Sequence, residues 1–155
     1  MTIDARIAAL GLHLPAPRAP AFAYVPVAMD GGLAWVSGQL PWRPDGSLPK
    51  GSLGGGISVE EGKAAARLCV LNGLSVLRET IGSLDRVRRI VKVVGFVASA
   101  EGFVEQPAVV DGASNLLGEI FGEAGRHARS AVGVAALPRG VPVEVEFVAA
   151  IDAPA

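Results

Sequence analysis

The stretch over residues 128–147 constrains the fold more than any other part of this 155-residue chain. Short apolar runs with an alternating pattern lie on both sides of Leu-Pro-Arg-Gly at 137–140, where proline and glycine supply a turn. The pattern predicts a C-terminal hairpin of two antiparallel strands. Pairing across this turn puts Arg129, Glu144 and Glu146 on one face of the sheet. We therefore expect Arg129 and Glu144 to lie close together on neighbouring strands.

Arg129 has two interpretations at this position. Its neighbours on the same face of the strand are small, Ala131 and Gly133, which leaves room for an anion at the planar guanidinium group. Alternatively, the arginine and a glutamate form a solvated surface ion pair, a common and weak arrangement. The residues alone leave both interpretations open.

The sequence before this stretch predicts two strands followed by a long helix. Apolar residues cluster on both sides of the turn Asp30-Gly31-Gly32, which predicts a hairpin over residues 22–37. Ser58 and Glu61 fit a capping box, and helical periodicity continues for roughly two dozen residues after it. The charged residues of this helix are expected on its solvated side.

Two further elements connect the long helix to the C-terminal stretch. A run rich in β-branched residues at 87–97 predicts a central strand covered on both faces, and residues 103–121 predict a second helix with Pro107 in its first turn. The element order indicates an α+β fold, with a mixed β-sheet and two main helices on one face. The other face of the sheet would be too apolar for a monomer, which favours an oligomer.

No internal repeat or linker divides the chain, so residues 1–155 are expected to form a single domain. Residues 1–20 are an N-terminal extension, with a short helix marked by Ile3 and Ile7 and a proline-rich connector. Residues 41–57 predict an irregular loop, rich in glycine and proline, in which Trp42 could line a cleft or merely pack.

Composition argues against several classes of function. The formal net charge of −1 provides no general attraction to nucleic acid or to an anionic membrane. No apolar run reaches the length of a membrane-spanning helix, and no signal sequence opens the chain. Cys69 is expected to be a buried thiol, and two distant histidines offer no metal-site spacing. We expect a soluble, cytoplasmic protein without metal or cofactor.

The pair Arg129-Ser130, followed by alternating valine and glutamate, resembles the signature of the RidA/YjgF family of enamine and imine deaminases, also labelled L-PSP endoribonucleases. The match extends upstream to Phe22-Ala23-Tyr24-Val25, to the turn at 30–32 and to Val36-Ser37-Gly38-Gln39-Leu40-Pro41, in the same order and spacing. The resemblance implies a chorismate-mutase-like fold. It also implies a homotrimer whose three sheets close into a central β-barrel, with ligand clefts between neighbouring subunits.

The resemblance further implies an activity and residues that perform it. Proteins of this family hydrolyse reactive 2-enamine and 2-imine acids to 2-keto acids and ammonia. Arg129 matches the arginine that holds the substrate carboxylate, and Glu144 matches the acidic residue that orients or deprotonates the attacking water. Glu146 is the residue most easily confused with Glu144. Tyr24 falls where the family places a tyrosine that closes the cleft.

Three positions depart from the family pattern. Ala131 stands where a cysteine is usual, although its backbone amide can still bind a carboxylate oxygen. Ser114 and Asn115 are the candidates for an asparagine of the second helix. His127 is expected on the face of Arg129, with a structural or substrate-shaping role favoured over proton transfer.

Three classes of function remain open: a cofactor-free deaminase, a non-catalytic module that binds small carboxylates such as 2-keto acids, and an endoribonuclease. Arg129 together with Glu144 favours the deaminase, because a binding module needs the arginine but no acid–base group. The cluster Arg88, Arg89 and Lys92 has no aromatic residues interleaved for base stacking, which argues against the nuclease. The expected partners are a small-molecule carboxylate and two further copies of the chain.

Overall fold

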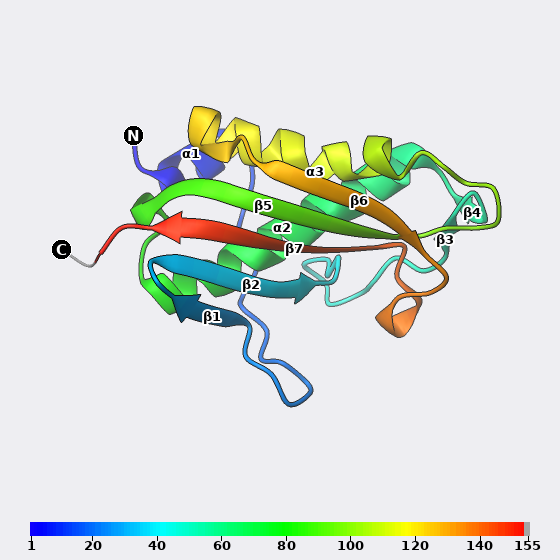
Figure 1. Ribbon diagram of the computed structural model, residues 1–155, viewed down its shortest axis with the longest axis horizontal. Helices are drawn as coiled ribbons and strands as arrows, with labels where there is room; N and C mark the ends of the chain where they lie inside the picture. The colour runs from blue at the N-terminus through cyan, green and yellow to red at the C-terminus, as the bar shows by residue number, and fades with distance from the viewer. Residues whose placement is uncertain (154–155) are drawn as a thin grey trace.

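A five-stranded mixed sheet forms one layer of the computed structural model, which describes residues 1–153, and two long helices form the other (Figure 1). The strand order is β1–β2–β7–β5–β6, and only β5 and β6 run parallel to each other. The strands are β1 (Val27–Asp30), β2 (Leu33–Gln39), β5 (Val87–Ala98), β6 (Ala128–Val134) and β7 (Val143–Ile151). This arrangement confirms the predicted α+β class, with both main helices on one face.

The first hairpin turns where the sequence predicts it. Gly31 and Gly32 both adopt positive φ, 54° and 77°, the backbone that a two-residue hairpin turn with matching twist requires. The strand pairing begins later than expected, because β1 starts at Val27 and residues 22–24 form bends.

The two helices begin at the predicted signals. In front of α2 (Val59–Ile81), the Ser58 hydroxyl accepts a hydrogen bond from the Glu61 amide (3.1 Å), and the Glu61 carboxylate accepts one from the Ser58 amide (2.7 Å). Helix α3 (Gln106–Phe121) has Pro107 in its first turn. Both helices pack on the sheet, and Cys69 of α2 is buried in this core, as expected.

The predicted C-terminal hairpin is wrong, because β5 lies between β6 and β7. Arg129 pairs with Val93 of β5, which pairs on its other side with Phe147. Val93 and Phe147 are buried against the helices, so Arg129 faces the helical layer. Glu144 pairs with Phe96, three residues further along β5 than Val93 and on the opposite face of the sheet. The expectation that Arg129 and Glu144 share a face is therefore also wrong.

The connection between strands explains the error. The small, apolar residues of β6 would fit beside β5 or beside β7, so the strand pattern does not decide between these two neighbours. Helix α3 connects β5 to β6, and a helical crossover joins parallel strands. The segment 135–142, with the short 3-10 helix η3 (Pro138–Gly140), passes the end of β5 to reach β7. It is longer than the connection of about two to five residues usual in a hairpin.

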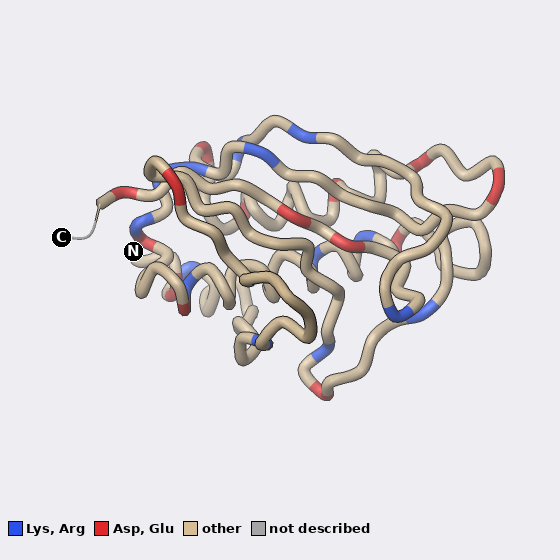
Figure 2. The backbone as a smooth tube through the Cα atoms, turned by 60° about the horizontal axis from the view of Figure 1, so that its bottom comes forward, with Lys and Arg blue, Asp and Glu red and all other residues tan. Residues whose placement is uncertain are grey.

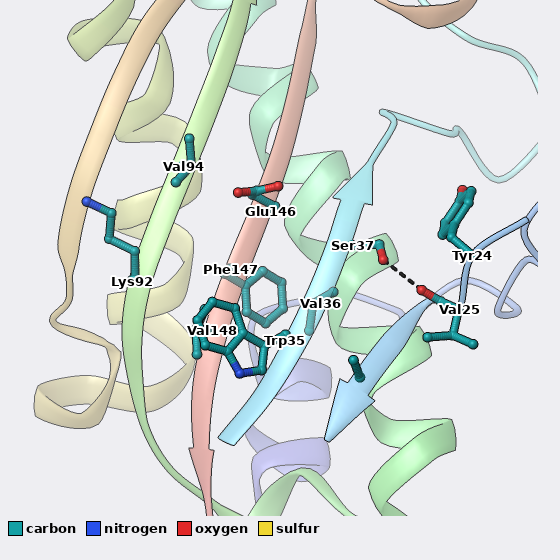
Figure 3. Close-up of a pocket in the computed structure, with 11 residues that line it drawn as sticks. Tyr24, Val25, Trp35, Val36, Ser37, Lys92, Val94, Glu146, Phe147 and Val148 are labelled. Carbon is teal, nitrogen blue, oxygen red and sulfur yellow. Dashed lines mark hydrogen bonds between the residues drawn. The ribbon is translucent and has the colours of Figure 1, made fainter. Parts of the chain in front are cut away.

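Strand β5 also differs from its prediction. Its residues alternate in burial: Val93, Gly95 and Val97 face the helices, whereas Lys92 and Val94 are only half-buried on the other face. In the single chain this strand is thus covered on one face, not both. We call the uncovered side, which carries Trp35, Val94 and Glu146, the open face of the sheet (Figure 3).

The N-terminal extension packs against the helical layer. The predicted short helix is present as α1 (Ile3–Ala9), and Arg6 donates from Nε to the carbonyl of Glu119 in α3 (2.8 Å). The connector then passes along α2, where Ser75 donates to the carbonyl of Pro15, before it returns toward β1. Among residues 1–153, none of the helices combines the length and the hydropathy needed to cross a bilayer.

The loop after β2 is irregular over most of its length, as predicted. It includes the two-residue strands β3 (Ser52–Leu53) and β4 (Gly56–Ile57), and Leu53 is buried in the core. A further 3-10 helix follows each long helix, η1 (Leu84–Arg86) and η2 (Gly122–Gly125).

Candidate functional site

A bulge in β2 contains Gly38, which lies against the side chain of Glu144. Val36 pairs with Phe147 and Gln39 with Val145, so two residues of β2, Ser37 and Gly38, oppose one residue of β7. The Glu144 carboxylate lies directly over Gly38, where any β-carbon would overlap its oxygen. Glycine at this position therefore allows the glutamate to lie against the strand.

Glu144 lies in a groove of about 580 Å³, which we call the Glu144 groove. Tyr24 and Phe22, from the bends before β1, contribute to the same groove. Ser37 donates a hydrogen bond to the carbonyl of Val25 (2.7 Å), which ties the Tyr24 segment to β2 (Figure 3). Arg18, Trp42, Arg139 and Glu146 also line the groove.

The electrostatics of the groove suit a proton-transfer role for Glu144. Its side chain is half-buried, and this burial raises the pKa of its carboxyl above the ordinary value, with the Glu146 carboxylate raising it further. A carboxyl group with a raised pKa can hold a proton and release it closer to neutral pH.

Arg129 lies in a different cluster, between the edge strand β6 and helix α3. Its Nη1 donates to the Asp111 carboxylate (2.7 Å) and to the Ser114 hydroxyl (3.1 Å), and its Nη2 donates to the carbonyl of Pro107 (3.3 Å). The arginine side chain is only 23% exposed. This ion pair was not anticipated, although the Asp111–Ser114 spacing puts both side chains on one helix face.

His127 shares a small hollow with Arg129 and Ser114, on the face of the sheet where the strand alternation puts it. Burial lowers the pKa of His127, and the charge of Arg129 acts in the same direction. Asn115, the alternative to Ser114, is exposed and does not contact Arg129. Ala131 follows on β6, half-buried against the core.

Comparison with known proteins identifies the family. The model of a family described as YjgF/chorismate mutase-like, putative endoribonuclease, matches residues 4–149. The chain belongs to the YjgF family. The resemblance inferred from the Arg129-Ser130 motif is therefore confirmed.

Individual YjgF relatives cover almost the whole chain. Protein TCP17 of Trypanosoma cruzi is 48% identical over 145 residues, which are 93% of this chain and 91% of TCP17. The crystal structure of a putative endoribonuclease from Shewanella oneidensis MR-1 is 37% identical, with a TM-score of 0.93, and covers 97% of this chain and 100% of that one. The structure of E. coli TdcF with bound serine shares the fold, at 24% identity and a TM-score of 0.64, over 90% of this chain and 96% of that one.

The predicted site residues of this YjgF protein thus form two groups. Tyr24 and Glu144 line one groove, and Arg129 contacts Ser114 on the other side of the sheet. A single chain does not bring the two groups together. Within residues 1–153, no three His, Cys, Asp or Glu side chains are arranged to hold a metal ion.

The prediction missed the contributions of Arg18 and Arg139 to the Glu144 groove. Both guanidinium groups lie over the ring of Trp42, at 4.1 Å and 5.5 Å from its centroid. Trp42 therefore lines the groove, which decides between the two interpretations of that residue. The proline-rich connector contains no motif that points to a role for Arg18.

Proposed function

We propose that this YjgF protein hydrolyses reactive 2-enamine and 2-imine acids to 2-keto acids and ammonia, without a cofactor. The observation that carries the proposal is the half-buried Glu144 carboxyl, whose pKa is raised, in a groove that also contains Tyr24. The serine bound in the TdcF structure supports small amino-acid-like carboxylates as ligands of this fold.

The chemistry requires water and one group that both accepts and returns a proton. Glu144 takes a proton from water as the water oxygen attacks C2 of the imine, and the C=N double bond becomes a C–N single bond. The glutamate returns this proton to nitrogen, which gives an intermediate with a hydroxyl and an amino group on C2. Glu144 then takes the hydroxyl proton and passes it to the amino group as the C–N bond breaks, so that ammonia leaves and C2 becomes the keto carbon. An enamine first takes a proton at C3 and loses one from nitrogen, which gives the imine. The raised pKa of the Glu144 carboxyl makes it a stronger base, which favours uptake of the proton from water.

We propose that Arg129 joins this site from a second copy of the chain. Its three hydrogen bonds leave Nε and one Nη2 hydrogen without a partner among residues 1–153, and this edge of the guanidinium can bind a carboxylate through two parallel hydrogen bonds. Because β6 is an edge strand, Arg129 lies where a neighbouring subunit can approach. Such a carboxylate clamp fixes which substrate atom faces the water.

The open face supports the homotrimer that such a site requires. Trp35 and Val132 on this face are 53% and 43% exposed, beside half-buried Val94, Phe96 and Val148. A large apolar surface of this kind is usually covered by another protein surface. Three copies that close their sheets into a barrel would bury it. In contrast, acidic and basic positions are interspersed in both layers (Figure 2), which argues against an extended basic surface for RNA.

The experiment is to generate 2-aminoacrylate or 2-iminopropanoate in solution and to measure 2-keto acid formation. Wild-type protein is expected to accelerate hydrolysis, Glu144→Gln to lose the acceleration, and the matched Glu146→Gln variant to retain most of it. Light scattering checks that all three proteins have the same mass. If the folded wild-type oligomer does not accelerate hydrolysis, the proposal fails. A carboxylate-binding module then becomes the leading interpretation, tested by titration with 2-keto acids.

A further inference from the structure

Two arginines of the Glu144 groove have no role in the proposed hydrolysis of the imine. Arg18 comes from the connector before β1, and Arg139 comes from the turn between β6 and β7. The Trp42 ring brings both to one place, with guanidinium carbons 4.1 Å and 5.5 Å from the ring centroid. Stacking on an aromatic ring holds the plane of a guanidinium group but leaves its N–H edge free to donate.

The charges of Arg18 and Arg139 are not compensated within the part of the chain that the structure describes. Neither is among the arginines that form ion pairs over residues 1–153, whereas Arg129 is paired with Asp111. They line the groove together with Glu144 and Glu146, so that the groove contains two guanidinium groups and two carboxylates. An anion is therefore favoured beside the arginines at Trp42 and disfavoured beside the glutamates.

The backbone holds Arg139 in place. Among residues 1–153 it is the only residue other than glycine with positive φ, at 59°. Its turn is fixed from the loop before α2, because the Gly51 amide donates to the carbonyl of Gly140 (3.0 Å) and the Lys50 ammonium donates to the carbonyl of Arg139. A residue that its surroundings hold in an unfavourable backbone conformation often lies at a functional site.

We propose that the Glu144 groove takes a substrate with a second carboxylate, a dicarboxylic 2-imine acid, and that Arg18 and Arg139 hold this distal carboxylate. The inference rests on the proposed function and narrows its substrate class. Arg129 of a neighbouring copy binds the carboxylate next to the imine, so the two arginines over Trp42 are available to bind a second carboxylate. The groove volume of about 580 Å³ is within the range of sites that hold molecules larger than a three-carbon imine.

Equilibrium binding of stable 2-keto acids tests the inference apart from catalysis. Isothermal titration is done with 2-oxoglutarate, with its distal methyl ester and with 2-oxobutanoate. Wild-type protein is expected to bind 2-oxoglutarate at least about tenfold more tightly than the ester, which has the same 2-keto acid chain but no second charge. Arg139→Gln and Arg18→Gln each reduce this preference, and the double variant removes it, with 2-oxobutanoate affinity unchanged.

Arg43→Gln is the matched control. Arg43 follows Trp42 directly and donates to the Ser47 hydroxyl, but does not line the Glu144 groove. Its loss removes one positive charge next to Trp42 in the chain but from outside the groove, and is expected to leave the preference for 2-oxoglutarate intact. A preference that falls equally in Arg43→Gln would reflect net charge alone and overturn the inference.

The remaining outcomes separate this inference from the proposed function. Equal affinity of the wild-type protein for 2-oxoglutarate and its ester, beside rapid hydrolysis of 2-iminopropanoate, overturns the dicarboxylate site and leaves the hydrolase intact. A preference for 2-oxoglutarate that depends on Arg18 and Arg139, without hydrolysis of any imine, overturns the hydrolase and supports the dicarboxylate site.

Discussion

Gly38 offers a direct test of whether the Glu144 carboxyl must lie against β2. A β-carbon at this position would be 2.9 Å from Cδ and 3.2 Å from Cγ of Glu144, and closer still to Oε1. Nonbonded carbon atoms prefer separations of about 3.5–4.0 Å. In Gly38→Ala the carboxyl group must therefore move by about 1 Å, into the groove and away from its present position.

A displacement of this size is expected to lower kcat for imine hydrolysis by about 100-fold. The protein should remain folded, because Glu144 is only half-buried and can turn toward the groove. The free energy of unfolding is expected to change by less than about 1 kcal/mol, since alanine also restricts the unfolded chain more than glycine does. Formation of 2-keto acid measures the first quantity, and urea unfolding measures the second.

The same substitution in a Glu144→Gln background shows whether the effect passes through the carboxylate. If it does, Gly38→Ala lowers the residual rate no further, and the two losses do not add. Full activity of a folded Gly38→Ala protein would refute the reasoning. So would an equal further loss in the Glu144→Gln background, because the substitution would then act on something other than the carboxylate.

Three further predictions concern charged groups. Folding raises the pKa of Glu144, so the protonated carboxyl contributes its full stability below the unfolded pKa, near 4.5, and this contribution is lost as pH rises through the folded pKa. Glu144→Gln should therefore raise Tm relative to wild type at pH 8 but not at pH 4. Glu146→Gln removes one cause of the raised pKa and should move the acidic limb of the pH–rate profile of imine hydrolysis to lower pH; an unmoved limb would contradict this. Asp111→Asn weakens the partly buried pair with Arg129 and should lower the free energy of unfolding by about 1 kcal/mol in urea, and no change would mean that the pair is merely a surface contact.

Local signals accounted for most of the secondary structure. The reciprocal hydrogen bonds of Ser58 and Glu61, and the two positive-φ glycines between β1 and β2, depend on residues adjacent in the chain. Such features can be predicted because the interacting groups are only a few residues apart. The Arg129-Ser130 motif, together with the matching segments upstream of it, was likewise enough to identify the YjgF family.

The faces of the sheet could not be assigned in the same way. An alternating strand determines which residues share a face, but not which neighbour it pairs with or which side meets the helices. The crossover through α3 decided this for β6, and it separated Arg129 from Glu144. In the same way, no local pattern predicts the ion pair between Arg129 and Asp111, because it requires β6 to lie beside α3.

By itself, then, the sequence determined the elements, the family and the chemical types of the candidate residues, since each depends on short-range patterns. The tertiary structure decided which of those residues meet. Arg18, Trp42 and Arg139 are far apart in the chain and carry no shared motif, yet they line one groove with Glu144. Their meeting depends on how the connector, the loop after β2 and the turn before β7 pack together, and packing between distant segments is a property of the whole fold.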